Sequence, residues 1–499
     1  MVSLTTVAYA TLAIVLAALL MPRPMLDKLG MRAVAVWLLA IPLLLFTQAA
    51  LPALLLSLVI LAALAPATPS LRLAFFVAIV PAFPWYIEAI VPFPGINYLI
   101  TLTYYKAAVL VLFAPALFLP RLDQEPRQSW SLIDTCIVAY IAFTVIKHVL
   151  STDIISGMRF TVDQMFFVGL PYFAITRLAT RIEHVNDCLK AFMLASIVLA
   201  GIALVSTYKQ WDFYQIQQYV SRGVGADFRG SYLRIEGPLT THSLGFHLVA
   251  ATVMLEYVKY KVPIGLLRLW AIRASLLAGI VFTGSRGSIL ALIVATIVYF
   301  ILSLRSSALR WGLIASASIV GVIVGYMLAF EDVSAYSLYG GFSYRQQLLT
   351  TSLDYISENP LFGDLAFLES GRFDQLVQGL GIIDITNLYL LIGLKYGLIG
   401  LTFFFVPFIL TGSRLAAQAM KYSRTRDKST DLPVAAHSVL CGTIIGWMVL
   451  VVTTSDVGLT LHLGIFLVAL GHALVQLTKG ALTQPRTRDH VAEHSLASG

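Results

Sequence analysis

Apolar runs close to membrane length recur along the whole chain, from residues 4–21 to residues 457–478, and they limit the fold more than any other feature. A straight helix needs about 20 apolar residues to cross a bilayer. Several runs are shorter, so we predict about 12–15 transmembrane helices. With 58% hydrophobic and only 12% charged residues, the chain could not cover a soluble surface with polar groups. The sequence therefore predicts an all-α, polytopic integral membrane protein.

The basic residues test this assignment, because short cytoplasmic loops retain Lys and Arg. If the N-terminus is outside, the inner loops carry nearly all short-loop Lys and Arg, whereas the short outer loops 92–97 and 455–456 carry none. The alternation places the C-terminus in the cytoplasm. The net charge of +8 then reflects topology and attraction to lipid headgroups, and nucleic-acid binding is not expected.

Two connections on the outer side are too long to be simple turns, and they define the domain organisation. Within the longer one, SYRQQLLTTSLDYISENP predicts an amphipathic helix over the membrane mouth, with one face formed by Tyr344, Leu348, Leu349, Ser352 and Tyr355. The predicted segments are N-terminal helices (1–207), an outer loop (208–239), central helices (240–330), a large outer loop (331–385), C-terminal helices (386–478) and a disordered cytoplasmic tail (479–499). The predicted spans include the runs 71–91 and 98–119.

The hexapeptide TGSRGS at 283–288 places Arg286 between two glycines inside an apolar stretch. A charged side chain in a membrane span is costly and usually faces a partner or a cavity. In one interpretation, Arg286 lies in a tight outer turn that Gly284 and Gly287 permit. In the other, Arg286, Ser285 and the first N–H groups of the next helix bind an anion at the outer face.

Three further arginines are predicted on the same side of the membrane: Arg159, Arg234 and Arg345. Guanidinium groups bind phosphate through paired hydrogen bonds. Outward-facing arginines in so apolar a protein favour a phosphate or pyrophosphate ligand whose lipid tail stays in the bilayer.

Four motifs resemble the bacterial O-antigen ligase and polymerase superfamily. They are LRIEGPLTTHSLGFHLVAA, FTGSRGSILALI, YRQQLLTTSLDYISENPLFG and TNLYLLIGLKYGLIGL, in that order, within residues 230–411. The resemblance implies an architecture like that of the metal-independent, lipid-dependent (GT-C-like) glycosyltransferases. It also implies oligosaccharide substrates carried on undecaprenyl pyrophosphate and chemistry at the periplasmic face of the bacterial inner membrane.

One departure bears on the branch of this superfamily. The ligase branch carries a His-Asn pair at the helix after the large loop, with a glycine eleven residues beyond the histidine. In this chain the asparagine is Asn387 and the glycine is Gly397, but Thr386 takes the place of the histidine. Threonine cannot act as a general base at neutral pH. The resemblance therefore favours a Wzy-type polysaccharide polymerase over an O-antigen ligase, which stays open as the alternative.

The reaction suggests roles for the candidate residues. Departure of pyrophosphate needs positioned cations, and the acceptor hydroxyl needs a base. We predict catalytic roles for Glu236, His242 and Arg286. The predicted substrate-binding residues are Arg159, Arg234, Ser285, Arg345 and Asn387. For His242 the alternative is a helix cap with its neighbours, and for Glu236 it is an ion pair with Arg234.

The remaining sequence features are not expected to take part in catalysis or ligand binding. The cysteines Cys136, Cys188 and Cys441, and also His247, are predicted to be buried packing residues. SRGVGADFRG at 221–230 follows no strand and is not a dinucleotide site. No metal or cofactor is expected. A chain-length regulator and a flippase are candidate partners. A transporter of lipid-linked or acidic sugars stays open as another function, although the two halves show no internal repeat.

Overall fold

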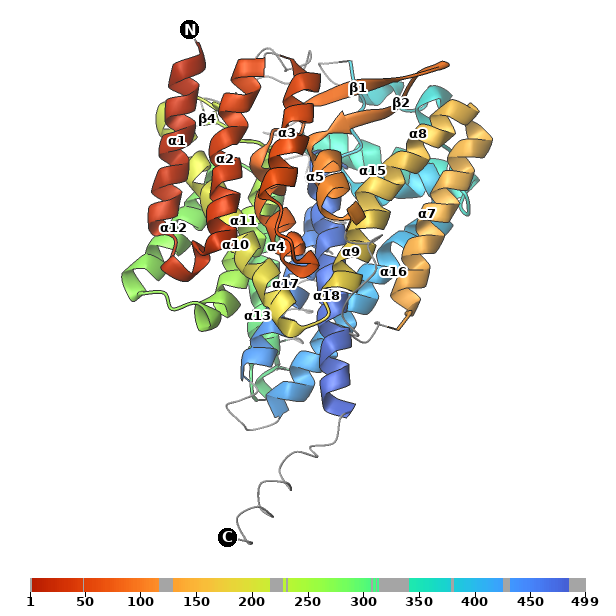
Figure 1. Cartoon of the computed structure of the whole chain (residues 1–499). Helices are drawn as coiled ribbons and strands as arrows, with labels where there is room; N and C mark the ends of the chain where they lie inside the picture. Colours follow the sequence, from red (N-terminus) through yellow and green to blue (C-terminus); the bar gives the residue numbers. More distant parts are fainter. Residues whose placement is uncertain are drawn as a thin grey trace, which may run out of the picture.

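The computed structural model describes most of the chain (Figure 1). The described residues are 2–47, 49–115, 129–215, 228–229, 232–306, 308–310, 312–313, 341–377, 381–424 and 431–483. Residues 314–330 of the predicted central helices, nearly all of the glycine-rich stretch 221–230 and residues 484–499 of the predicted tail lie outside them.

Helices dominate the described residues, and they confirm the all-α polytopic class. Seven helices in this part of the chain are long and apolar enough to cross a membrane. These are α2 (Lys28–Thr47), α7 (Leu132–Ser151), α10 (Ile182–Lys209), α13 (Arg286–Ser303), α16 (Leu388–Arg424), α17 (Asp431–Leu450) and α18 (Thr460–Thr483). Shorter apolar helices lie in α1 (Val2–Leu20), α3 (Ala50–Leu64) and α4 (Pro69–Ile79). Membrane-length helices are fewer in the described residues than the predicted spans, because several apolar runs form shorter helices.

The remaining elements complete the bundle. They are the helices α5 (Tyr104–Leu112), α8 (Ile154–Gln164), α9 (Leu170–Leu178), α11 (Thr241–Lys261), α12 (Leu266–Phe282) and α15 (Gly341–Glu358), and the short strands β3 (Phe228–Arg229) and β4 (Tyr232–Leu233). Helix α10 is buried along most of its length and packs against α1, α4, α11 and α12. Helix α17 packs along α13 and α16. All three cysteines are buried, as predicted.

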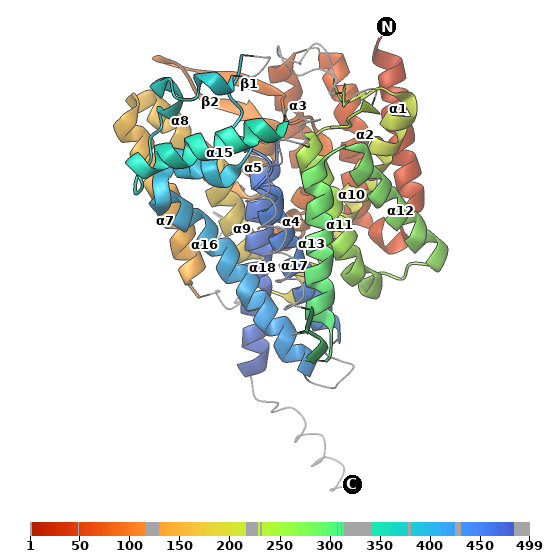
Figure 2. The ribbon, with the colours of Figure 1, turned by 180° about the vertical axis from the view of Figure 1, so that it is seen from behind.

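A β-hairpin interrupts two predicted spans, at residues 88–91 and 98–103. Strands β1 (Glu88–Phe93) and β2 (Ile96–Thr103) pair antiparallel, so the predictions of continuous spans over 71–91 and 98–119 are wrong. The sequence EAIVPFPGINYLITLT explains the difference, because β-branched and aromatic residues flank a Pro-Gly turn. The hairpin lies at the end of the molecule where α1 begins, together with α8 and α15 (Figures 1 and 2).

The large loop between α13 and α16 contains the predicted amphipathic helix. Helix α15 lies across the end of the bundle (Figure 2). Leu348, Ser352 and Tyr355 are buried, and the Tyr344 hydroxyl donates to the Asp384 carbonyl at 2.8 Å. Leu349, which was predicted on this face, is 44% exposed and points away from it. The buried face packs on a separate apolar cluster with Phe367, Phe373, Leu376, Ile385, Leu390 and Leu394.

Helix α16 is broken at Gly397, where the large loop docks into it. Gly397 has φ 62° and ψ −166°, a conformation open almost only to glycine. The freed N–H groups of Leu398 and Ile399 donate to the carbonyls of Pro360 and Leu361, at 2.8 and 3.2 Å. Such pairing satisfies backbone groups that have no water partner in a membrane. The loop and the helix therefore form one hydrogen-bonded unit.

Candidate active site

The turn between α12 and α13 holds the TGSRGS motif. Gly284 has φ +60°, and Ser285 caps α13 by accepting a hydrogen bond from the Ser288 N–H at 3.2 Å. Thr283 Oγ1 accepts from the Ser285 N–H, also at 3.2 Å. The Thr283, Ser285 and Ser288 side chains are buried, whereas Arg286, the first residue of α13, is exposed. The motif therefore combines the tight turn of the first interpretation with the exposed arginine that the second requires.

Arg234 lies over this turn. Its Nε donates to the Thr283 carbonyl at 3.3 Å, and Nη2 donates to Thr241 Oγ1 at 3.1 Å. A Cβ atom at position 284 would lie 3.2 to 3.3 Å from the Arg234 side chain. Gly284 is therefore required both for its backbone conformation and for the close approach of this guanidinium group.

His242 joins the first turn of α11 to the same motif. Its Nδ1 lies 3.0 Å from Ser285 Oγ. The cap of α11 is Thr240, whose hydroxyl accepts from the Ser243 N–H at 3.2 Å. The capping role that was the alternative interpretation of His242 thus belongs to Thr240, and His242 instead bridges two helix N-termini.

Asp212 was not among the predicted site residues, although it fixes the segment that carries Glu236. It is 3% exposed, and its Oδ2 accepts from the N–H groups of Glu236 and Gly237 at 2.9 and 2.8 Å. Burial raises the pKa of the Asp212 carboxyl, while these N–H groups oppose the rise. The Ile235 N–H donates to the Phe282 carbonyl at 3.1 Å on the other side of the segment. Glu236 is thereby held beside the end of α12.

The loop between α17 and α18, residues 451–459, touches three helix N-termini. The Val451 carbonyl accepts from Leu388 N–H of α16 at 2.9 Å. Thr453 packs so closely on Gly287 of α13 that a Cβ there would overlap its hydroxyl. Ser243 Oγ of α11 donates to the Val457 carbonyl at 3.2 Å. Helix N-termini carry partial positive charge, so the starts of α11, α13 and α16, together with Arg234 and Arg286, bring positive charge to this region, which also contains the acids Asp456 and Glu236.

The other predicted binding residues lie on or next to three further helices, and their binding roles stay predictions. Asn387 caps α16, because its Oδ1 accepts from the Tyr389 and Leu390 N–H groups at 2.9 and 3.2 Å. Arg345 is exposed on α15. Arg159 lies on α8, where its Nε donates to the Tyr98 carbonyl at 3.0 Å and its guanidinium carbon lies 3.7 Å from the centre of the Tyr98 ring. The contacts shown for Arg159 are with the hairpin and not with the TGSRGS motif.

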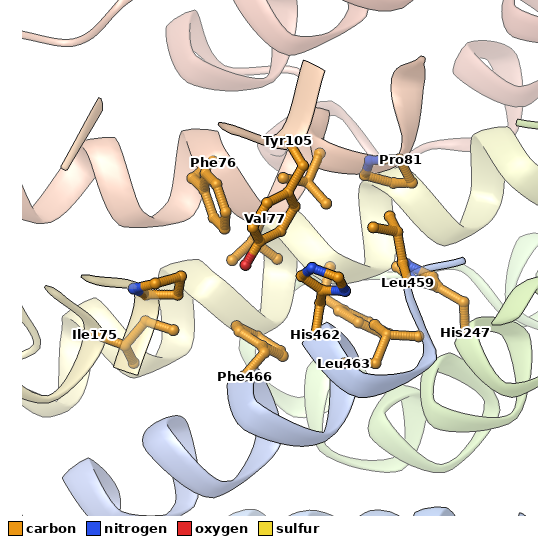
Figure 3. Close-up of a pocket in the computed structure, with 13 residues that line it drawn as sticks. Phe76, Val77, Pro81, Tyr105, Ile175, His247, Leu459, His462, Leu463 and Phe466 are labelled. Atoms are coloured by element: carbon orange, nitrogen blue, oxygen red, sulfur yellow. The ribbon is translucent and has the colours of Figure 1, made fainter. Parts of the chain in front are cut away.

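An apolar cavity of about 40 Å³ lies deeper in the bundle (Figure 3). Its walls come from α4, α5, α9, α10, α11 and α18, and His247 and His462 supply its ring nitrogens. His247 is 3% exposed and stacks on Phe192, with ring centroids 4.1 Å apart, which confirms its prediction as a packing residue. A cavity of this size holds a few waters at most. In the described part of the chain, no group of three or more His, Cys, Asp or Glu side chains could hold a metal ion.

Loss of the Ser285 hydroxyl is expected to weaken the site's scaffold. Ser285→Ala removes the cap of α13 and the partner of His242, so we expect the free energy of unfolding to fall by about 0.5–2 kcal/mol. Thermal melting of the purified protein in detergent measures this. Ser413→Ala, which removes an exposed hydroxyl that donates only to the Leu410 carbonyl of its own helix, is the matched control. Equal melting temperatures for both variants would contradict the capping role.

Comparison with known proteins adds one match. Residues 271–405, which run from α12 through the large loop into α16, match a family model described as O-antigen ligase. No curated protein matches the chain. The matched segment contains Ser285, Arg286, Arg345 and Asn387, whereas Arg159, Arg234, Glu236 and His242 precede it.

Proposed function

We propose, from the premise that the chain carries an O-antigen ligase family domain over residues 271–405, that it transfers glycan from undecaprenyl pyrophosphate. The preferred reaction is polymerisation of lipid-linked oligosaccharide repeat units. It takes place at the periplasmic face of the bacterial inner membrane, with the C-terminus in the cytoplasm. The product is a polysaccharide such as an O-antigen, a capsule or an exopolysaccharide.

The observation that carries the proposal is the pairing of Arg234 and Arg286 around one helix-capping turn. Arg234 is oriented by the Thr283 carbonyl and Thr241, and Arg286 projects from the start of α13. Both guanidinium groups and the α13 N-terminus can bind the two phosphates of the lipid carrier. The charge that grows on the departing pyrophosphate is the charge such preorganised donors stabilise. No metal is needed for this step.

Glu236 and His242 are the candidates from the sequence for accepting the acceptor's proton. His242 shares Ser285 with the arginine turn, which supports a role for its ring beside the proposed pyrophosphate site. The hydrogen bonds that Asp212 accepts fix the backbone at Glu236, two residues after Arg234. In the proposed mechanism, His242 orients Ser285 and the α12–α13 turn. Glu236 lies beside the end of α12, which leads into this turn.

Thr386 supports polymerase over ligase. It occupies the position of the histidine that marks the ligase branch, and it precedes the Asn387 cap of α16. The alternative is transfer of a complete glycan to a lipid or protein acceptor, which the description of the matching family model favours.

The products made by the purified protein distinguish these reactions. With undecaprenyl pyrophosphate oligosaccharide as the only substrate, we expect a ladder of lengths that differ by one repeat unit. Gel electrophoresis or mass spectrometry of the released glycans measures it. Absence of a ladder, together with a single addition to a supplied lipid or protein acceptor, would replace polymerase by ligase. Substrate that crosses liposome membranes without any glycosidic bond forming would instead identify a transporter.

A further inference from the structure

Asp456 lies in the loop that joins the three helix N-termini, and it was not among the predicted site residues. Thr453, three residues earlier, packs on Gly287, and Gly458, two residues later, packs on the Thr240 side chain. At no more than 3.8 Å between successive Cα atoms, Asp456 lies within roughly 11 Å of Thr453 and roughly 8 Å of Gly458. Asp456 thus lies near the starts of α13 and α11.

The α12–α13 turn contacts both this loop and Arg234. Gly284 contacts Arg234, whereas Gly287 contacts Thr453 of the loop. Arg286, between the two glycines, is exposed. A pyrophosphate bound by Arg286 would therefore have Arg234 on one flank and the Asp456 loop on the other.

The surroundings of Asp456 suit a proton acceptor. Asp456 is exposed, yet the protein around it partly desolvates its carboxylate. Burial raises the pKa of Asp456 to about 6, and the positive charge of Lys395 on α16 opposes the rise. Tyr140 of α7 and Tyr396 of α16 are the other titratable groups within electrostatic range. A bound pyrophosphate would raise this pKa further, because like charges disfavour ionisation.

We propose that Asp456 is the general base that accepts the proton of the acceptor sugar's hydroxyl group. This inference rests on the proposed glycan transfer. The hydroxyl oxygen attacks the anomeric carbon of the donor sugar and forms the new glycosidic bond. The bond from that carbon to the pyrophosphate oxygen breaks, and both of its electrons leave with undecaprenyl pyrophosphate. The hydroxyl proton moves to the Asp456 carboxylate and then to solvent, to which Asp456 is exposed.

Chemistry favours Asp456 over the groups beside the arginines. A carboxylate close to a guanidinium group is held in its charged form and is a weaker base. A base is most effective when its pKa lies near the working pH. In the described part of the chain Asp456 forms no ion pair with an arginine, and it supplies the proton acceptor that Thr386, in the place of the ligase histidine, cannot supply.

The test compares Asp456→Asn with Asp456→Glu in full-length protein in detergent, with undecaprenyl pyrophosphate oligosaccharide as substrate. A positioned base contributes roughly 10²–10⁴-fold. We expect Asp456→Asn to lower kcat at least about 100-fold, with KM for the lipid substrate little changed. The wild-type rate should rise with pH through an apparent pKa near or above 6. This rise in rate with pH (the pH limb) should be absent from Asp456→Asn. In Asp456→Glu it should persist with part of the rate but at a shifted pH, because Asp and Glu differ in their ordinary pKa.

Asp354→Asn, which neutralises an exposed acid on α15, is the matched control and should leave rate and pH profile unchanged. Wild-type kcat and pH limb in Asp456→Asn would overturn the inference while leaving glycan transfer standing. A wild-type protein that forms no glycosidic bond would overturn both. If Asp456→Asn does not fold, Asp456→Glu decides, because a pH limb that does not move with the new carboxyl group contradicts the assignment.

Discussion

Arg286→Ala is expected to reduce kcat/KM for glycan transfer by at least about 100-fold, because loss of one preorganised donor to a developing anion typically costs 10²–10³-fold. Arg286 is exposed at the first residue of α13, so its removal should leave the fold intact. Arg286→Lys keeps the charge but loses the planar pair of donors, and we expect an intermediate rate. Steady-state kinetics with undecaprenyl pyrophosphate oligosaccharide measures all three proteins.

The matched control for Arg286 is Arg268, an exposed arginine in the first turn of α12, at the opposite end of that helix from the TGSRGS turn. Arg268→Ala changes the net charge equally but leaves the turn unaltered. It should transfer glycan at the wild-type rate. If Arg286→Ala is folded and as active as Arg268→Ala, Arg286 does not bind the pyrophosphate.

Gly397→Ala should destabilise the protein more than loss of the Ser285 cap does. The residue has φ 62° and ψ −166°, and an added Cβ would overlap the Leu361 carbonyl group. Strained backbone alone costs about 1–3 kcal/mol, and the loss of the loop contacts adds to it. We expect a lower melting temperature and faster proteolysis between residues 359 and 364. Size-exclusion chromatography after heating, and limited proteolysis, measure these effects.

Gly412 is the control on the same helix. The nearest atom to a Cβ at position 412 is 4.0 Å away, on Ile444, which is ordinary van der Waals contact. Gly412→Ala should therefore melt at or slightly above the wild-type temperature, since alanine favours a helix. A Gly397→Ala protein with the stability of Gly412→Ala would show that the large loop does not depend on the break in α16.

Membrane-length apolar runs predicted the helical class well, because burial in lipid allows few alternatives to a helix. They failed at residues 88–103, where the same apolar residues pair as a hairpin. Hydropathy does not distinguish an apolar strand from part of a span. The break at Gly397 could not be predicted either, since it depends on the carbonyls of Pro360 and Leu361, more than 30 residues earlier.

The candidate site was predictable in its local part only. Ser285, Arg286 and His242 lie next to helix starts, and the structure brings Ser285 and His242 within 3.0 Å. Asn387 caps α16 through its Oδ1, as its place before an apolar run suggests, and its binding role stays a prediction. Asp212 and Asp456 lie in loops distant in the sequence from the TGSRGS motif, and no sequence motif marked them. Their contacts depend on tertiary packing.

The meeting of Gly363 and Gly397 has a consequence for how this chain can vary. A Cβ at position 363 would lie against the Leu394 carbonyl and the Gly397 N–H, and a Cβ at position 397 would lie against Leu361 and Phe362. Both glycines serve one contact, so their substitutions are thermodynamically coupled. Once a side chain at either position has separated the loop from α16, a substitution at the other position lowers the free energy of unfolding only a little further. The two positions therefore vary as a single site, although 33 other residues separate them in the sequence.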